Sequence, residues 1–191
     1  MTHLSLQSDV LFGSLVATYG NHVIHELPYS RANLQQFWLK VKHHKNIFNT
    51  ELRGDFEKFV SLFIEQHGEE LVPRGLIWVV DDFAAMMYLT HISEHEATAH
   101  ISLMDREARD PEIAKELMRY VFRTFKFHRL NAEVPVYVVG WFFDYVKSVG
   151  FIEEGNRRKC YWFDNKWFDA RIYGLLASEV LGVETIALGI R

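Results

Sequence analysis

The sequence predicts an α/β protein in which helices flank a mixed, mostly antiparallel central sheet. Three observations carry this prediction. Residues 75–105 hold three β-rich runs with short acidic breaks, residues 110–127 hold one strongly amphipathic helix, and strands alternate with helices from there to residue 176. Such an order favours a sheet covered by helices. With 191 residues, 49% of them hydrophobic, the chain is long enough for one domain with one core.

The first 70 residues are predicted to be mainly helical and to form a divergent N-terminal part of this domain. Ser30 is a favoured N-cap, and apolar residues at helical spacing follow it as far as Val41. Residues 51–68 repeat the apolar spacing from Phe56 to Ile64, and Gly68 stands where a glycine commonly ends a helix.

The recognisable core is expected to cover residues 75–176. Residues 84–105 read as two antiparallel strands joined by a turn in the stretch SEHEA. A capped helix begins near Asp110, a strand covers residues 129–138, a short helix covers residues 140–150, and two further strands meet at a turn at Asp164 and Asn165. The apolar tail, residues 177–191, is expected to pack against the sheet or a partner chain.

Composition excludes some classes of function. A net charge of −4 argues against general nucleic-acid binding. The single cysteine, Cys160, excludes an internal disulfide and fits a reducing compartment. No run approaches the roughly 20 apolar residues of a membrane helix, and no Lys or Arg precedes the first apolar segment. We therefore expect a cytoplasmic protein without a membrane partner, which could also be incorporated into a virion or another assembly.

The stretch from Gly150 to Leu176 carries a family resemblance. It contains a Gly-Phe pair, the run Glu-Glu-Gly at 153–155, a basic pair at 157–158, and a finish of Asp169, Tyr173 and Leu175-Leu176. In this order the motifs resemble the GNAT superfamily of N-acetyltransferases, in the branch that acetylates ribosomal proteins, protein N-termini and small amines. The resemblance covers about residues 75–176, and it implies a GNAT-like fold, acetyl-CoA as cofactor and transfer of an acetyl group to an amine.

The stretch REARDPEIAKEL, residues 106–117, departs from the family pattern for the pyrophosphate loop. That pattern is Arg or Gln, two residues, Gly, one residue, then Gly or Ala. Here Arg109 takes the first position and Ala114 the last, but Glu112 replaces the central glycine. Pro111 has no N–H to offer a phosphate. If acetyl-CoA binds, the candidate cofactor-binding residues are Arg109 and Ala114, together with Arg106.

The same residues make an ordinary helix start. Asp110 is a favoured N-cap, proline is favoured at the first helical position, and an acid complements the helix dipole. A carboxylate about 4 Å from a phosphate charge costs about 1–4 kcal/mol near a protein surface. Weak or absent binding of acetyl-CoA is therefore predicted.

The helix before Gly150 also departs from the family. Relatives place an Asn twelve residues before the Phe, and a Tyr five residues before it protonates the leaving thiolate. Those positions are Val139 and Val146 here. Tyr145 is a candidate catalytic residue only if the register shifts, because one residue turns a helix by about 100°.

The histidines of the predicted strands are candidates for the general base of an acetyl transfer. A two-residue turn at His95 and Glu96 would place His91 opposite His100. The pair could be a catalytic base or two ordinary strand histidines. No third ligand has suitable spacing, so no metal site is predicted.

The run CYWF, residues 160–163, is apolar on both faces of its strand, which fits either an ordinary core or an interface. We expect a protein partner or self-association through these aromatic C-terminal strands. The main functional prediction is a non-catalytic binding or structural component without a cofactor, for example in a phage particle. The alternative is an acetyl-CoA-dependent N-acetyltransferase that acts on a protein N-terminus or a small amine.

Overall fold

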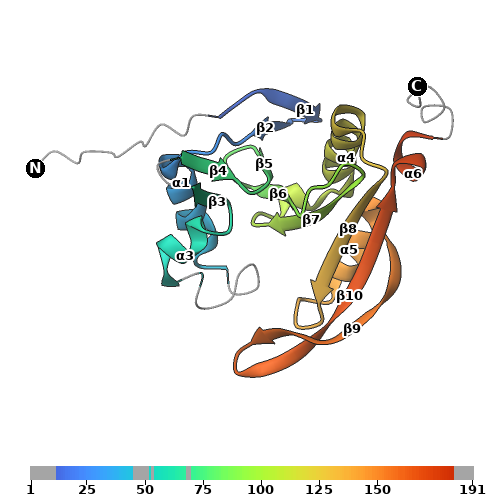
Figure 1. Cartoon of the computed structure of the whole chain (residues 1–191). Coiled ribbons are helices and arrows are strands. Elements are labelled where there is room, and N and C mark those ends of the chain that lie inside the picture. Colours follow the sequence, from blue (N-terminus) through green and yellow to red (C-terminus); the bar gives the residue numbers. More distant parts are fainter. Residues whose placement is uncertain (1–11, 45–51, 53, 68–69, 183–191) are drawn as a thin grey trace, which may run out of the picture.

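The structure is a computed structural model that describes residues 12–44, 52, 54–67 and 70–182. Within these residues an eight-stranded sheet forms the centre, with the strand order β1-β2-β5-β6-β7-β8-β10-β9 (Figure 1). The paired strands are antiparallel except for β7 and β8, which are parallel. The predicted mixed, mostly antiparallel sheet with flanking helices is confirmed.

The N-terminal part is less helical than predicted. It opens with a hairpin, β1 (Leu15–Tyr19) and β2 (His22–Glu26), before α1 (Arg31–Val41) and the short α3 (Phe56–Val60). Ser30 caps α1 as expected, since its side chain accepts a hydrogen bond from the Asn33 N–H. The second predicted helix is wrong beyond Val60, because β3 (Ile64–His67) pairs with β4 (Glu70–Pro73) in a separate two-stranded sheet. Gly68 lies outside the described residues.

The middle of the chain follows the prediction. Strands β5 (Leu76–Val80), β6 (Ala85–Thr90) and β7 (Glu96–Leu103) form an antiparallel meander. After the 3-10 turn η1 (Glu107–Arg109), α4 (Pro111–Phe125) begins at the predicted cap. The apolar stripe of α4 is buried because it packs on the sheet.

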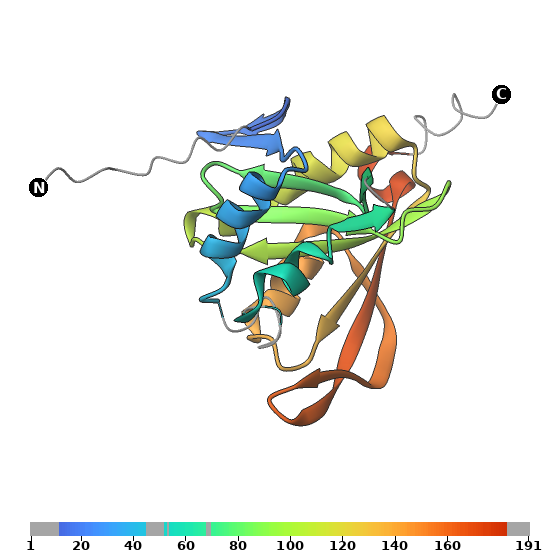
Figure 2. The ribbon, with the colours of Figure 1, turned by 60° about the vertical axis from the view of Figure 1, so that its left-hand side comes forward.

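The C-terminal elements are β8 (Arg129–Pro135), α5 (Trp141–Val149), β9 (Ile152–Phe163), β10 (Lys166–Leu176) and α6 (Ala177–Leu181). The predicted turn at Asp164 and Asn165 is confirmed, and both residues have positive φ, 47° and 57°. The hairpin of β9 and β10 extends beyond the rest of the molecule in Figures 1 and 2. In the apolar tail, Ala177 is buried and Val180 packs against the core; residues 183–191 lie outside the description.

Two hydrophobic cores lie on opposite faces of the sheet. One packs α4 and α5 against the sheet, and the other packs α1 and α3 against strands β5 and β6 (Figure 2). Among the described residues, no helix is both long enough and apolar enough to cross a membrane.

Candidate functional site

The parallel pair β7 and β8 separates along its length. Ladder pairs join the two strands only at Glu96–Arg129, Ala97–Leu130 and Thr98–Asn131 within the described residues. Strand β7 continues along β6 to Leu103, and β8 continues along β10 to Pro135. Beyond Thr98 the facing backbone edges of the two strands are therefore left open to an extended ligand.

This separation opens a groove of about 530 Å³. Residues 99–103 of β7 and 132–135 of β8 form its walls. Helix α5 contributes Trp141, Phe142 and Val146, and the β9–β10 hairpin contributes Tyr161 and Trp162. A large groove that combines apolar walls with several polar groups is a common form of ligand site.

His100 and Glu133 are polar groups on the two walls of the groove. Extending the register of Thr98 and Asn131 by two residues places them on the same face of the sheet, across the gap from each other. Glu133 carries the one carboxylate among the described residues that line the groove, and its Oε1 accepts a hydrogen bond from Arg157 at 3.0 Å. Sequence reasoning missed Glu133, because only the strand register brings it to His100.

His100 is held by contacts on two sides. Its ring stacks on Tyr88 with the centroids 4.3 Å apart, and its Nε2 lies 2.8 Å from Thr90 Oγ1. Burial, with a smaller contribution from the charge of His91, lowers the pKa of His100 to about 4. His100 is therefore neutral at pH 7 and can take part in hydrogen bonds within the groove.

The prediction that His91 lies opposite His100 is wrong in register. Tyr88 is the ladder partner of His100, because residues 91–95 form a longer connection than the predicted two-residue turn. The Thr90 hydroxyl nevertheless lies between the two imidazoles, 3.1 Å from His91 Nδ1. Within the described part of the chain, no three His, Cys, Asp or Glu side chains are grouped so that they could hold a metal ion.

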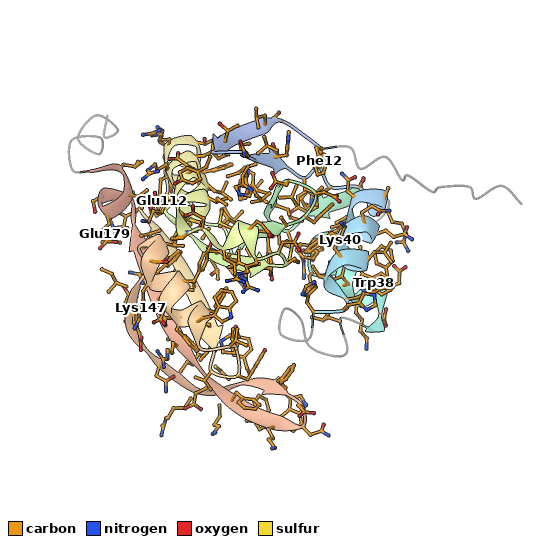
Figure 3. The ribbon with its side chains drawn as sticks, turned by 180° about the vertical axis from the view of Figure 1, so that it is seen from behind. Phe12, Trp38, Lys40, Glu112, Lys147 and Glu179 are labelled. Atoms are coloured by element: carbon orange, nitrogen blue, oxygen red, sulfur yellow. The ribbon has the colours of Figure 1, made fainter. Side chains whose placement is uncertain are left out.

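The N-terminus of α4 is closed by its own residues. Asp110 Oδ1 accepts a hydrogen bond from the Glu112 N–H at 3.0 Å, and the Asp110 carbonyl accepts one from the Ile113 N–H at 3.2 Å. Pro111 has no N–H. The Glu112 carboxylate, which Figure 3 labels, pairs with Lys115 at 2.6 Å. The predicted capped helix is confirmed.

The three candidate cofactor contacts lie in different surroundings. Arg109 lines the groove, and its guanidinium lies 4.4 Å from the centroid of the Trp141 ring. Arg106 is exposed and is not part of the groove lining. Ala114 is buried on the core side of α4. Arg109 is thus the candidate that can reach a ligand in the groove.

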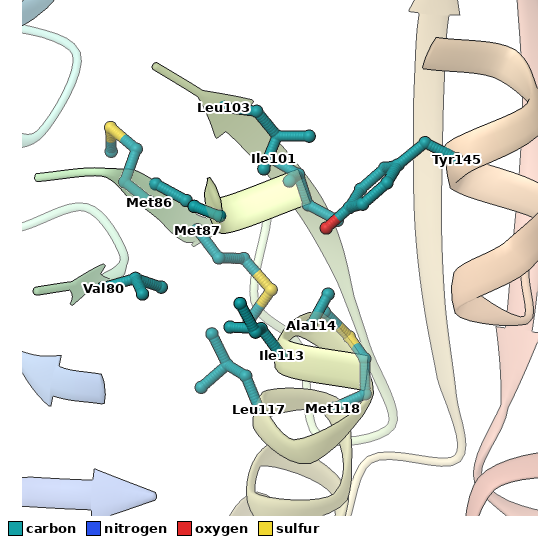
Figure 4. Close-up of a pocket in the computed structure, with 12 residues that line it drawn as sticks. Val80, Met86, Met87, Ile101, Leu103, Ile113, Ala114, Leu117, Met118 and Tyr145 are labelled. Carbon is teal, nitrogen blue, oxygen red and sulfur yellow. The ribbon is translucent and has the colours of Figure 1, made fainter. Parts of the chain in front are cut away.

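Tyr145 and Val146 face different spaces. Val146 lines the groove, whereas Tyr145 is 6% exposed and lines a separate cavity of about 20 Å³ beside α4. In Figure 4 its hydroxyl points towards Ile101 and Ala114. Burial and the nearby Asp110 raise the pKa of Tyr145, so its hydroxyl stays protonated. Helix α5 therefore places Val146, and not Tyr145, at the groove, as expected from the sequence without a shift in register.

The aromatic hairpin closes one side of the groove. Tyr137 stacks on Phe163, with centroids 4.3 Å apart, and Tyr161 lines the groove. Trp162 and Trp167 form a cross-strand pair and are 50% and 54% exposed. Self-association through these strands stays a prediction.

The meander, the separated parallel pair and the helix that connects its strands define a protein with the GNAT acetyltransferase fold. Solved structures share this fold at low sequence identity. The ribosomal-protein-S5-alanine acetyltransferase from Vibrio fischeri matches with a TM-score of 0.63 and 12% identity, over 85% of this chain and 97% of that chain. A dodecameric spermidine N-acetyltransferase from Vibrio cholerae matches with a TM-score of 0.64 and 16% identity, over 84% and 96%. No family model and no curated protein matches the sequence.

Proposed function

We propose that the protein is an amine N-acyltransferase that binds the extended arm of a thioester donor between β7 and β8. The groove between the separated strands carries this proposal. An amide-bearing arm can pair with open strand edges as an added strand does, while the apolar residues of the groove pack against its hydrocarbon parts. In this proposal the arm of acetyl-CoA occupies the groove, whereas the Glu112 and Ile113 N–H groups at the start of α4 already have protein acceptors and are not free for its diphosphate.

Acyl transfer replaces the C–S bond of a thioester by a C–N bond, and the attacking amine must lose a proton. Glu133 accepts that proton, because it is the carboxylate of the groove. Arg157 holds its orientation through the hydrogen bond at 3.0 Å. Neutral His100, across the gap, can donate or accept a hydrogen bond and so helps to position the amine.

The departing thiolate needs a proton in return. Val146 cannot supply one, and Tyr145 faces the cavity beside α4. Tyr161 lines the groove, and burial, its largest influence, raises its pKa to about 12. It therefore keeps its proton at neutral pH, and we assign it the role that Tyr145 cannot fill.

A non-catalytic binding or structural role is the second candidate. The start of α4 favours it, because the Glu112 and Ile113 N–H groups, which could otherwise bind a phosphate, already have protein acceptors. In that role the groove would receive a segment of a partner, in a phage particle or another assembly, and the fold would serve as a scaffold.

A transfer assay with calorimetry separates the two candidates. The protein is mixed with an acetyl thioester and with either a polyamine or a short peptide, and the released thiol and the acetylated product are measured. Glu133→Gln is expected to slow transfer about 100-fold, in the usual range for an acid–base group, with donor affinity unchanged. Glu94→Gln, at an exposed position outside the groove lining, should have no effect. Donor binding without transfer would favour the scaffold role.

A further inference from the structure

We infer that the acyl donor is a phosphopantetheine thioester that is recognised without its nucleotide. Acetyl-CoA would then bind no more tightly than acetyl-phosphopantetheine, the same arm with a single phosphate. This inference rests on the proposed acyl transfer and specifies the donor for the same groove.

Four backbone donors near the start of α4, those of Asp105, Arg109, Glu112 and Ile113, already have protein acceptors. The Glu112 N–H donates to the Asp110 side chain, and the Ile113 N–H donates to the Asp110 carbonyl. Earlier in the loop, the Asp105 N–H donates to Ala84 O at 2.9 Å and the Arg109 N–H to Arg106 O at 3.1 Å. A diphosphate is normally held by several free N–H groups at a helix start, and these groups have protein acceptors here.

Side-chain charge adds to this effect. The Asp110 carboxylate lies over the helix N-terminus, where the diphosphate would otherwise be, and Glu112 is in the first turn. Lys115 pairs with Glu112 and so offsets part of the charge of that acid instead of attracting a phosphate. Asp110, together with the part of the Glu112 charge that Lys115 leaves, repels the several charges of a nucleotide diphosphate. One such unfavourable pair near a protein surface weakens binding by about tenfold.

One cation remains available at the groove. Arg109 lines it, has its guanidinium carbon 4.4 Å from the centroid of the Trp141 ring, and forms no ion pair with any described residue. A guanidinium that packs on an aromatic ring can still bind a phosphate through two parallel hydrogen bonds. The groove thus offers a site for an extended arm and a contact for one phosphate.

A series of three donors tests this inference by calorimetry on the full chain. Acetyl-pantetheine has no phosphate, acetyl-phosphopantetheine has one, and acetyl-CoA adds the nucleotide. The Kd of acetyl-phosphopantetheine is expected to be about tenfold lower than that of acetyl-pantetheine. The Kd of acetyl-CoA should differ from that of acetyl-phosphopantetheine by less than threefold. Adenosine 3′,5′-bisphosphate should not compete. A Kd for acetyl-CoA at least tenfold below that of acetyl-phosphopantetheine overturns the inference and leaves acyl transfer intact.

Variants locate the phosphate contact. Arg109→Ala should remove the tenfold difference between the first two donors, whereas Arg106→Ala, at an exposed position off the groove, should keep it. Glu112→Gly should strengthen the binding of acetyl-CoA without affecting acetyl-pantetheine, and Glu116→Gly controls for loss of helix stability. If Arg106→Ala removes the difference instead, Arg109 does not hold the phosphate and the inference is wrong.

A last comparison distinguishes two sources of the phosphopantetheine thioester, a carrier protein and a free small molecule. Transfer from an acetylated carrier protein is measured beside transfer from acetyl-phosphopantetheine. A lower KM for the carrier protein identifies it as the natural source, and equal KM values identify the small molecule; both results agree with the inference. Failure of all three small donors to bind overturns the proposed function itself.

Discussion

His100 should make the stability of the folded protein depend on pH. In the unfolded chain its pKa is 6.5, the value of a free histidine, and in the fold it is lowered to about 4 by burial and by His91. Between these two pH values the unfolded chain binds the proton and the folded protein does not. Stability is therefore fully present above pH 6.5 and is lost as the pH falls towards 4.

The magnitude follows from the size of the shift. A difference of about 2.5 pKa units corresponds to about 3 kcal/mol of unfolding free energy between pH 7 and pH 4, since one unit equals about 1.4 kcal/mol. Asp and Glu side chains titrate over part of this range, so the wild-type curve alone does not isolate His100. His100→Gln removes the titration and keeps a hydrogen-bonding group beside Thr90.

Urea denaturation at pH 7 and pH 4 measures both proteins. The wild type should lose about 3 kcal/mol more than His100→Gln over this interval, and His91→Gln, at an exposed position, should behave almost as the wild type. Equal losses in the wild type and His100→Gln would show that the His100 ring is solvated, and the described wall of the groove would then be wrong.

Three further perturbations test the structure. Asp110→Ala removes the cap of α4 and should cost about 1 kcal/mol in thermal or urea unfolding. Gly75→Ala places a Cβ against the Leu89 backbone carbonyl and should lower the melting temperature, whereas Gly155→Ala places a Cβ in open space and should not. Trp167→Ala should reduce the particle size in light scattering if the exposed aromatic pair mediates self-association; an unchanged size would count against that role.

Local chemistry explains what the sequence could predict. The start of α4 depends on Asp110 and Pro111 themselves, and the turn before β10 depends on two residues that tolerate positive φ. The spacing of Phe59 and Phe63 suits a helix, but β3 pairs with a strand across a short connection, so tertiary pairing decided the structure there. The sequence did not predict the hairpin of β1 and β2, whose second strand pairs with β5.

The candidate site was harder to predict because it depends on register. His100 was identified as a strand histidine, but its position opposite Glu133 follows only from pairing residue 98 with residue 131, over thirty residues away. The five-residue connection before β7 moved His91 out of the predicted pair. A one-residue change in either register would exchange the faces of these side chains.

The groove and the start of α4 depend on different parts of the chain, which explains how one can persist without the other. The separation of β7 from β8 is set by the strands that hold their outer edges, β6 and β10. The phosphate cradle is set by a few residues around Asp110. A helix start that binds phosphate has N–H groups without a protein acceptor whenever the phosphate is absent. Here the Asp110 side chain accepts a hydrogen bond from one of these N–H groups at all times, which stabilises α4 by about 1 kcal/mol. Residues 110–112 can therefore favour stability over nucleotide binding while the groove keeps its shape. A donor that needs only the groove and one arginine is consistent with that arrangement.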